Sequence, residues 1–222
     1  MTAPILLEHE TEEIRGIPGR LPEGERLLWQ GAPAWWPLAL RAYRVRALAI
    51  YFTALAALGF IAGLRDGLTA ADAVYGLVPL ILLAFTALGT VTLLAWLSAR
   101  ATVYSVTTRR VVIQGGAALP VSVNLPFSAV ASAQVKLHGD GTGDIALGLA
   151  APHRVSYLLM WPHVRPWHFS APEPSLRSIR APAEVAQLLS RALAAAAGIP
   201  TPPQPALDEA EDRARHPEPA VA

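Results

Sequence analysis

The sequence predicts an α+β membrane protein, in which a two-helix transmembrane hairpin precedes a small antiparallel β-barrel or sandwich capped by a C-terminal helix. Three observations predict this fold class: two long uncharged apolar runs, a series of short alternating segments after residue 100, and an amphipathic helical pattern that begins at Pro182. The chain of 222 residues has room for such a hairpin and for one soluble module of about 100 residues.

The chain begins with two polar stretches. Residues 1–20 are expected to be a flexible lead-in and not a signal peptide, because glutamates stand where a basic segment and an apolar core would be needed. Residues 21–46 are expected to form a cytoplasmic juxtamembrane segment with a short extended or one-turn stretch at 27–29. Within it, Trp35 and Trp36 are interpreted as interfacial anchors, with a binding site as the alternative.

The two apolar runs cover residues 47–64 and 73–99, and together they define a hairpin over 47–99. At about 1.5 Å per helical residue they reach about 27 Å and about 40 Å, against a hydrocarbon core of about 30 Å. A buried helix in a soluble core is the alternative, but such helices seldom run so far without a charge on any face. We therefore expect two membrane spans, with a bend at Pro79 in the second.

Arginines gather at the outer ends of the two runs: Arg41, Arg44, Arg46, Arg100, Arg109 and Arg110. The short connecting loop carries only Arg65. By the positive-inside rule, both termini are expected in the cytoplasm, in a multi-pass protein of the inner (cytoplasmic or intracytoplasmic) membrane. The soluble module would then work on the cytoplasmic face.

The spans are interpreted as structural. Gly59 and Gly63 form a small-x-x-x-small pair that lets another helix approach closely, and that helix could be the second span, a second copy in a homodimer, or a foreign membrane protein. Neither span contains an ionisable residue, and such residues usually mark ion or proton pathways. A transporter or channel is therefore not expected.

Alternation of apolar and polar residues replaces continuous apolar runs after residue 100. It predicts strands at residues 101–107, 110–114, 121–125, 129–137 and 144–149. The HGDGTG sequence at 138–143 is predicted to be a hairpin turn, because its residues tolerate positive φ. At least one further strand is expected from residues 157–161 and 167–170.

A helix is predicted to close the module, which is expected to span residues 100–198. Pro182 suits a first helical turn, Glu184 complements the helix dipole, and Gly198 supplies the stop. Apolar residues recur on one face: Val185, Leu188, Leu189, Ala192, Leu193 and Ala196. Residues 199–222 are rich in proline and charge and are expected to be a disordered tail.

Catalytic chemistry is not indicated. The formal charge of +1 gives no reason to expect nucleic acid, and the absence of cysteine excludes thiolate metal sites and cysteine nucleophiles. The GDGTGD sequence lacks the ligand spacing of a calcium loop and the Gly-Lys-Ser/Thr of a P-loop. His163 and His168 are interpreted as surface or turn histidines. No enzyme activity and no cofactor are expected.

Several motifs carry a family resemblance. LPEGERLLWQGAP (21–33), YSVTTRRVVIQGG (104–116), NLPF (124–127) and GTGDIAL (141–147) together resemble bacterial PH-domain membrane proteins. VNLPFSAVASAQV, LMWPHVRPW (159–167) and the PEPSLR turn are similar, more narrowly, to the PuhB family of photosynthetic complex assembly proteins. The resemblance covers about residues 16–195. It implies a PH-like fold, a bent antiparallel barrel capped by a helix.

The resemblance also implies a function without turnover. It points to an assembly factor for the photosynthetic reaction centre and core light-harvesting complex, with reaction-centre subunits and core antenna polypeptides as partners. The alternative is a general PH-domain membrane module for lipid binding or envelope stress. The candidate partner surface lies within residues 159–169, with the alternative that these side chains fill the barrel. Its candidate residues are Met160, Trp161, His163, Arg165 and Trp167.

Overall fold

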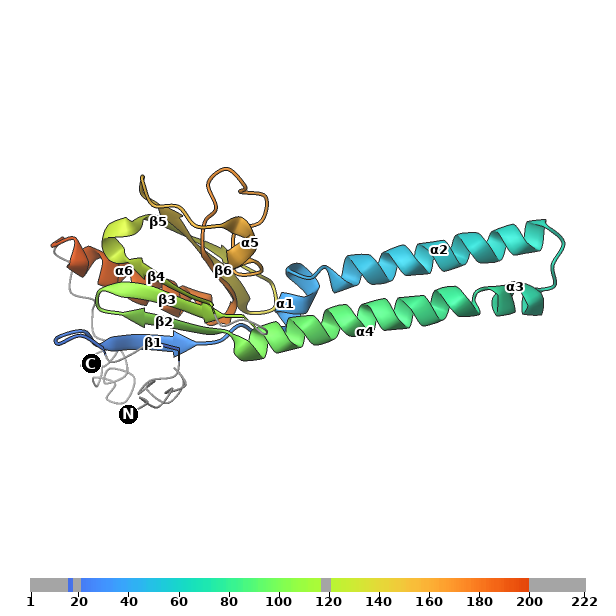
Figure 1. The fold of residues 1–222 in the computed structure, drawn as a ribbon, viewed down its shortest axis with the longest axis horizontal. Coiled ribbons are helices and arrows are strands. Elements are labelled where there is room, and N and C mark those ends of the chain that lie inside the picture. Colours follow the sequence, from blue (N-terminus) through green and yellow to red (C-terminus); the bar gives the residue numbers. More distant parts are fainter. Residues whose placement is uncertain (1–15, 18–20, 117–120, 200–222) are drawn as a thin grey trace, which may run out of the picture.

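The computed structural model describes residues 16–17, 21–116 and 121–199. The expected flexible lead-in and disordered tail fall almost wholly outside these residues. Within the described part, a strand module of two antiparallel sheets and a C-terminal helix stands at one end, and two long helices project from it as a hairpin (Figure 1). The predicted α+β class with an antiparallel module is confirmed.

The first sheet has four strands in the order β1-β2-β3-β4. They are β1 (Leu27–Gly31), β2 (Val103–Thr107), β3 (Arg110–Gly115) and β4 (Val121–Pro126). The three strands predicted between residues 101 and 125 are confirmed, but β1 corrects the expected start of the module at residue 100. This strand pairs with β2, although the entire helical hairpin separates the two strands in the sequence. The Gln30 side-chain amide donates to Ser105 Oγ at 2.9 Å.

The second sheet has three strands in the order β5-β6-β7. They are β5 (Val130–Leu137), β6 (Thr142–Leu149) and β7 (Ser175–Arg180). The predicted hairpin turn joins β5 to β6: the His138 N–H donates to the Thr142 carbonyl at 2.8 Å, and Gly141 has a positive φ of 76°.

The expectation of at least one strand from residues 157–161 and 167–170 is wrong. A single helical turn, α5 (Tyr157–Met160), occupies the first position, and irregular backbone with one isolated bridge at Val164 follows it. Two prolines, Pro162 and Pro166, explain this difference because neither can donate to a strand ladder. The last strand is β7 instead, which begins inside the PEPSLR sequence that was interpreted as a turn.

The two sheets share no strand among the described residues, so the module is a sandwich and not a closed barrel. Its core combines buried side chains from both sheets with the apolar face of α6 (Pro182–Ala196). Val185, Leu189 and Ala192 bury that face, which confirms the predicted closing helix.

Four helices connect β1 to β2. They are α1 (Trp35–Arg41), α2 (Val45–Arg65), α3 (Ala70–Gly76) and α4 (Val78–Ala101). The helices α2 and α4 are long and apolar enough to cross a membrane, and almost none of the residues in their most apolar stretches is buried. The second apolar run does not form one bent helix as expected, because it is divided at Leu77 and Pro79 lies in the first turn of α4.

The glycine pair of α2 lies against the same chain. A Cβ at Gly59 would stand 3.0 Å from Leu77 Cδ2, and one at Gly63 would stand 3.2 Å from Ala73 Cβ. The absence of side chains at both positions therefore lets α2 approach the α3 segment closely. Within the chain, the glycine pair thus packs against the other half of the hairpin.

The segment before the hairpin is fixed to the module by an ion pair. The Glu25 carboxylate is buried and accepts hydrogen bonds from Arg110 Nε at 2.7 Å and Arg110 Nη2 at 3.0 Å. Burial acts to raise the pKa of Glu25, but the hydrogen bonds from Arg110 and Thr107 outweigh it, so the pKa lies below its ordinary value.

We expect Glu25→Gln to lower the free energy of unfolding of the module by about 1–3 kcal/mol, because the amide cannot accept both hydrogen bonds from the Arg110 guanidinium. Urea titration of the full chain in detergent micelles, followed by tryptophan fluorescence, measures this change. Glu23→Gln, at an exposed neighbouring position, is the control and should change stability by less than about 0.5 kcal/mol. Equal effects of the two substitutions would contradict a stabilising pair.

Candidate functional site

The five candidate partner residues lie in what we call the aromatic segment (residues 157–169), and the structure divides them. Met160 and His163 are buried, with 3% and 4% of their surface exposed. Trp161 and Trp167 are exposed, and the half-buried Arg165 pairs with Glu173 at 2.8 Å. The segment therefore has an inner face that packs into the module and an outer face that is open to contact.

His163 is the centre of the inner face, which corrects its interpretation as a surface or turn histidine. Its Nδ1 lies 2.7 Å from the Tyr104 hydroxyl, and its Nε2 lies 2.9 Å from Thr102 Oγ1. Burial, reinforced by the charge of Arg177, lowers the pKa of His163 to about 3. The ring is therefore neutral at physiological pH.

The neighbouring hydrogen bonds fix the tautomer of this ring. The Thr102 hydroxyl donates to the Ser98 carbonyl at 2.7 Å, so its oxygen must accept from His163 Nε2–H. The Tyr104 hydroxyl accepts from the Arg177 backbone N–H at 3.1 Å and donates to His163 Nδ1. This chain of hydrogen bonds joins the last turns of α4 to β2, the aromatic segment and β7.

The outer face of the aromatic segment is apolar. Its most exposed side chains are Leu158, Leu159, Trp161, Trp167 and Phe169, with Leu158 at 86% and Trp167 at 72%. We call these five residues the apolar patch. The Phe169 ring packs at a tilt against Tyr157, with ring centroids 4.6 Å apart, and edge-on against Trp167, with centroids 6.1 Å apart. A cluster of exposed large apolar side chains in a soluble module typically marks an interaction surface.

The backbone of the patch carries strain at one position. Trp167 has a positive φ of 67°, a conformation that side chains other than glycine seldom adopt. Such strain persists only where surrounding structure enforces it, and it is often found at binding sites. Here the hydrogen bond from Arg165 N–H to the Glu173 carbonyl and the Arg165–Glu173 ion pair hold the neighbouring backbone. The tryptophan is thereby presented outward on a fixed loop.

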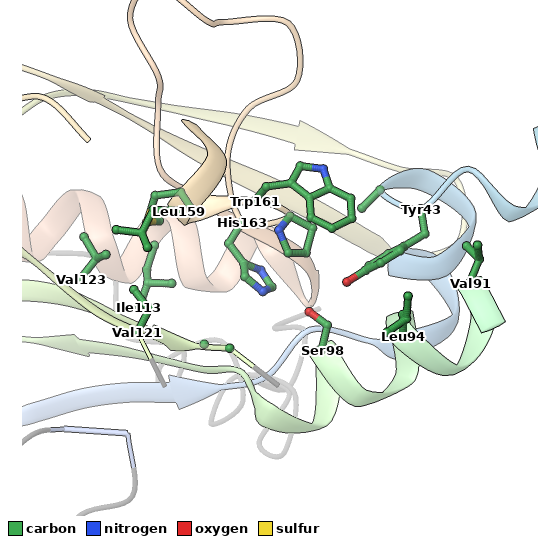
Figure 2. A pocket seen from close by; sticks show the side chains of 15 residues that line it. Tyr43, Val91, Leu94, Ser98, Ile113, Val121, Val123, Leu159, Trp161 and His163 are labelled. Atoms are coloured by element: carbon green, nitrogen blue, oxygen red, sulfur yellow. The ribbon is translucent and has the colours of Figure 1, made fainter. Parts of the chain in front are cut away.

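A cavity of about 450 Å³ lies between the aromatic segment, the end of α4 and strands β3 and β4 (Figure 2). Its walls are mostly apolar, with polar groups only where Tyr43, Ser98 and His163 meet. Figure 2 shows the Tyr43 hydroxyl directed toward Ser98, and the Tyr43 ring packs edge-on against Trp161 at 4.8 Å. The cavity thus lies where the helical hairpin joins the module.

The chemistry of this region is that of a contact surface. No carboxylate, lysine or arginine lines the cavity among the described residues, and both ring nitrogens of His163 are already hydrogen-bonded. In the described part of the chain there is also no group of three potential metal-ligating side chains. The sequence analysis names Trp161 and Trp167 as candidate contact residues but not Leu158, whose side chain is more exposed than either. The apolar run YLLMW, which contains Leu158, is the sequence signal that could have indicated it.

Comparison with known proteins agrees with this architecture. The model of the bacterial PH domain family matches residues 41–193, which include both long helices and six of the seven described strands. The chain belongs to the bacterial PH domain family. The PH domain match begins within α1, so β1 lies before it. The two sheets and the closing helix of this bacterial PH domain form an open sandwich, whereas the resemblance implied a bent barrel; the capping helix is as implied.

A protein of Rhodobacter capsulatus, described as an uncharacterized 23.7 kDa protein in the puhA 5' region, is similar to this bacterial PH-domain protein. The two are 38% identical over 193 residues, which cover 83% of this chain and 87% of the relative. No solved structure matches the chain at a significant level. Nothing in these similarities indicates an enzymatic activity.

Proposed function

We propose that this bacterial PH-domain protein is a non-catalytic assembly factor for the photosynthetic reaction centre and core light-harvesting complex. The single observation that carries the proposal is the exposed apolar patch, which is held on a strained, braced loop and adjoins no catalytic group among the described residues. The position of the 38% identical relative in the puhA 5' region supports a photosynthesis operon context. The motifs that resemble the PuhB family imply the same partners, reaction-centre subunits and core antenna polypeptides.

The proposed setting is the inner membrane, with α2 and α4 as its two spans and both termini in the cytoplasm. Exposed apolar side chains along both helices favour lipid around them, and the arginines at the outer ends favour this orientation. The patch has Leu159 and Trp161 at the cavity where the module meets the hairpin, and Trp161 packs against Tyr43 (Figure 2). It can therefore contact reaction-centre subunits and core antenna polypeptides close to the membrane surface.

A clean deletion in the native phototroph tests the proposal. We expect the near-infrared absorption of the reaction centre and core antenna to fall several-fold, while aerobic growth stays normal, because only the pigment complexes need the factor. Unchanged near-infrared spectra would remove the proposal. A growth or envelope defect in cells that make no bacteriochlorophyll would instead favour the general membrane module.

Complementation of this deletion tests the surface. We expect the wild-type gene to restore the spectra and Leu158→Glu/Trp167→Glu to fail, because two carboxylates in the centre of a desolvated contact oppose binding. The matched control is Leu28→Glu/Leu137→Glu, which adds two charges at exposed apolar positions on strands. Immunoblots establish equal protein levels. Full restoration by the patch variant would show that the contact lies elsewhere.

A further inference from the structure

A second cleft, of about 660 Å³, opens between the end of α1 and the second sheet. Unlike the apolar cavity, it is lined by five cationic side chains and a single carboxylate, that of Asp144. The five cations come from four parts of the fold: Arg41 and Arg44 beside the hairpin, Lys136 on β5, Arg165 on the aromatic segment and Arg177 on β7. The cleft is thus an electropositive concavity.

Ion pairs neutralise only part of this charge. Arg41 pairs with Asp140 at 2.7 Å, Arg165 pairs with Glu173 at 2.8 Å, and Arg177 Nε lies 3.2 Å from Asp144 Oδ2. The cleft therefore has five cations against three carboxylates, an excess of two.

The excess charge belongs to Arg44 and Lys136. Both are exposed, and neither forms an ion pair within the described residues. Arg177 also lines the cleft, but it is 95% buried, it lies beside Asp144, and its Nη1 donates to the Val164 carbonyl at 3.1 Å. The two exposed cations, Arg44 and Lys136, are therefore the ones available to an anion that enters the cleft.

The position of the cleft indicates where the anion comes from. Arg44 immediately precedes α2, which begins at Val45 and becomes continuously apolar after Arg46. The amphipathic ring of the exposed Trp167 also lines the cleft. An arginine at the end of a membrane span lies at the depth of the lipid headgroups, and exposed tryptophan rings favour the same layer. Phosphate groups are bound well by convergent guanidinium groups.

We infer that this cleft binds the phosphate of an anionic phospholipid headgroup from the membrane that holds the hairpin. The cleft is separate from the two arginines at the β2–β3 turn. Of these, Arg110 is already paired with the Glu25 carboxylate. A lipid in this cleft contacts the end of α1, the second sheet and the aromatic segment together. It would therefore fix the angle at which the module, and with it the apolar patch, meets the membrane.

Native mass spectrometry of the full chain in detergent tests the inference by titration with phosphatidylglycerol or phosphatidylcholine of identical acyl chains. We expect the first phosphatidylglycerol to bind at least about tenfold more tightly than the first phosphatidylcholine, and Arg44→Gln/Lys136→Gln to abolish this preference. Both substitutions are at exposed positions, so folding is preserved. The matched control Arg46→Gln/Arg109→Gln removes one juxtamembrane and one distal charge outside the cleft and should keep the preference.

Three outcomes would overturn the inference. Equal affinity for the two lipids would exclude an anion site, and equal losses in the two double variants would reduce it to diffuse attraction by juxtamembrane charge. Millimolar inorganic phosphate that binds as tightly as phosphatidylglycerol, and loses binding in Arg44→Gln/Lys136→Gln, would make the ligand a soluble phosphate. Because purified protein is used, the result is independent of the pigment phenotype that tests the assembly function.

Discussion

Replacing His163 by alanine is expected to lower the free energy of unfolding of the strand module by about 2–4 kcal/mol. Two costs combine in this value. The substitution leaves a void among the side chains that pack around the ring, and it removes the hydrogen-bond partners of the buried Tyr104 and Thr102 hydroxyl groups. Tyr104→Phe should cost less, about 1–3 kcal/mol, because it removes one hydroxyl and keeps the packing.

Urea titration of the full chain in detergent micelles measures both variants, with tryptophan fluorescence as the signal. His153→Ala, in an exposed loop, is the matched control and should change stability by less than about 0.5 kcal/mol. If His163→Ala were as stable as this control, the hydrogen-bond chain from α4 to β7 would contribute nothing to folding. A variant that cannot be purified while His153→Ala can would agree with the expected direction, and Tyr104→Phe would then supply the magnitude.

The elements that the sequence predicts well are those whose signals are local. The β5–β6 hairpin follows from alternation on both sides of HGDGTG, and α6 follows from Pro182 and one apolar face. The two long apolar helices follow from uninterrupted apolar composition, and α2 and α4 are long and apolar enough to cross a membrane. In each case, residues that are close together in the sequence are enough to predict the element.

The strand positions that the sequence does not predict depend on distant partners. β1 contains the stretch at 27–29 that was expected to be extended or one helical turn, but its place in the sheet is set by β2, which lies beyond the entire hairpin. β7 reads as polar because it contains Arg177 and Ser178, yet both are buried. Asp144 on β6 makes this possible, since its carboxylate accepts the Ser178 N–H at 2.7 Å and lies beside Arg177 Nε. The sequence alone does not show that Asp144 lies beside Arg177 and Ser178, because the pairing of β6 with β7 brings them together.

The candidate site, like the fold, could be predicted from the sequence only in part. Rigid aromatic side chains between prolines indicated an interaction segment, and Trp161 and Trp167 are exposed there. The same pattern could not separate them from Met160 and His163, because His163 is held inside by Tyr104 and Thr102 and Met160 by the core cluster, all of which form only in the folded module. The basic cleft was not anticipated at all, because its cations are scattered along the chain and only the fold brings them together.

Acidification is expected to destabilise the module through the same histidine. An unperturbed histidine has a pKa of 6.5, whereas the pKa of His163 in the folded protein is about 3, because burial and the Arg177 charge oppose protonation. Below about pH 6.5 the unfolded chain therefore binds a proton that the folded chain does not. The contribution of His163 to stability is complete above that pH and is lost progressively as the pH falls toward 3.

Between about pH 6.5 and about pH 5 this effect should remove about 2 kcal/mol of stability. Urea titrations over this range should be made on the wild type and on His163→Gln, whose amide can still donate to Thr102 and accept from Tyr104. The carboxylates of Glu25 and Asp140 have lowered pKa values and stay ionised throughout. The other histidines are present in both proteins, so the difference in pH slope isolates His163. Identical slopes would mean that His163 accepts a proton in the folded state as readily as in the unfolded chain.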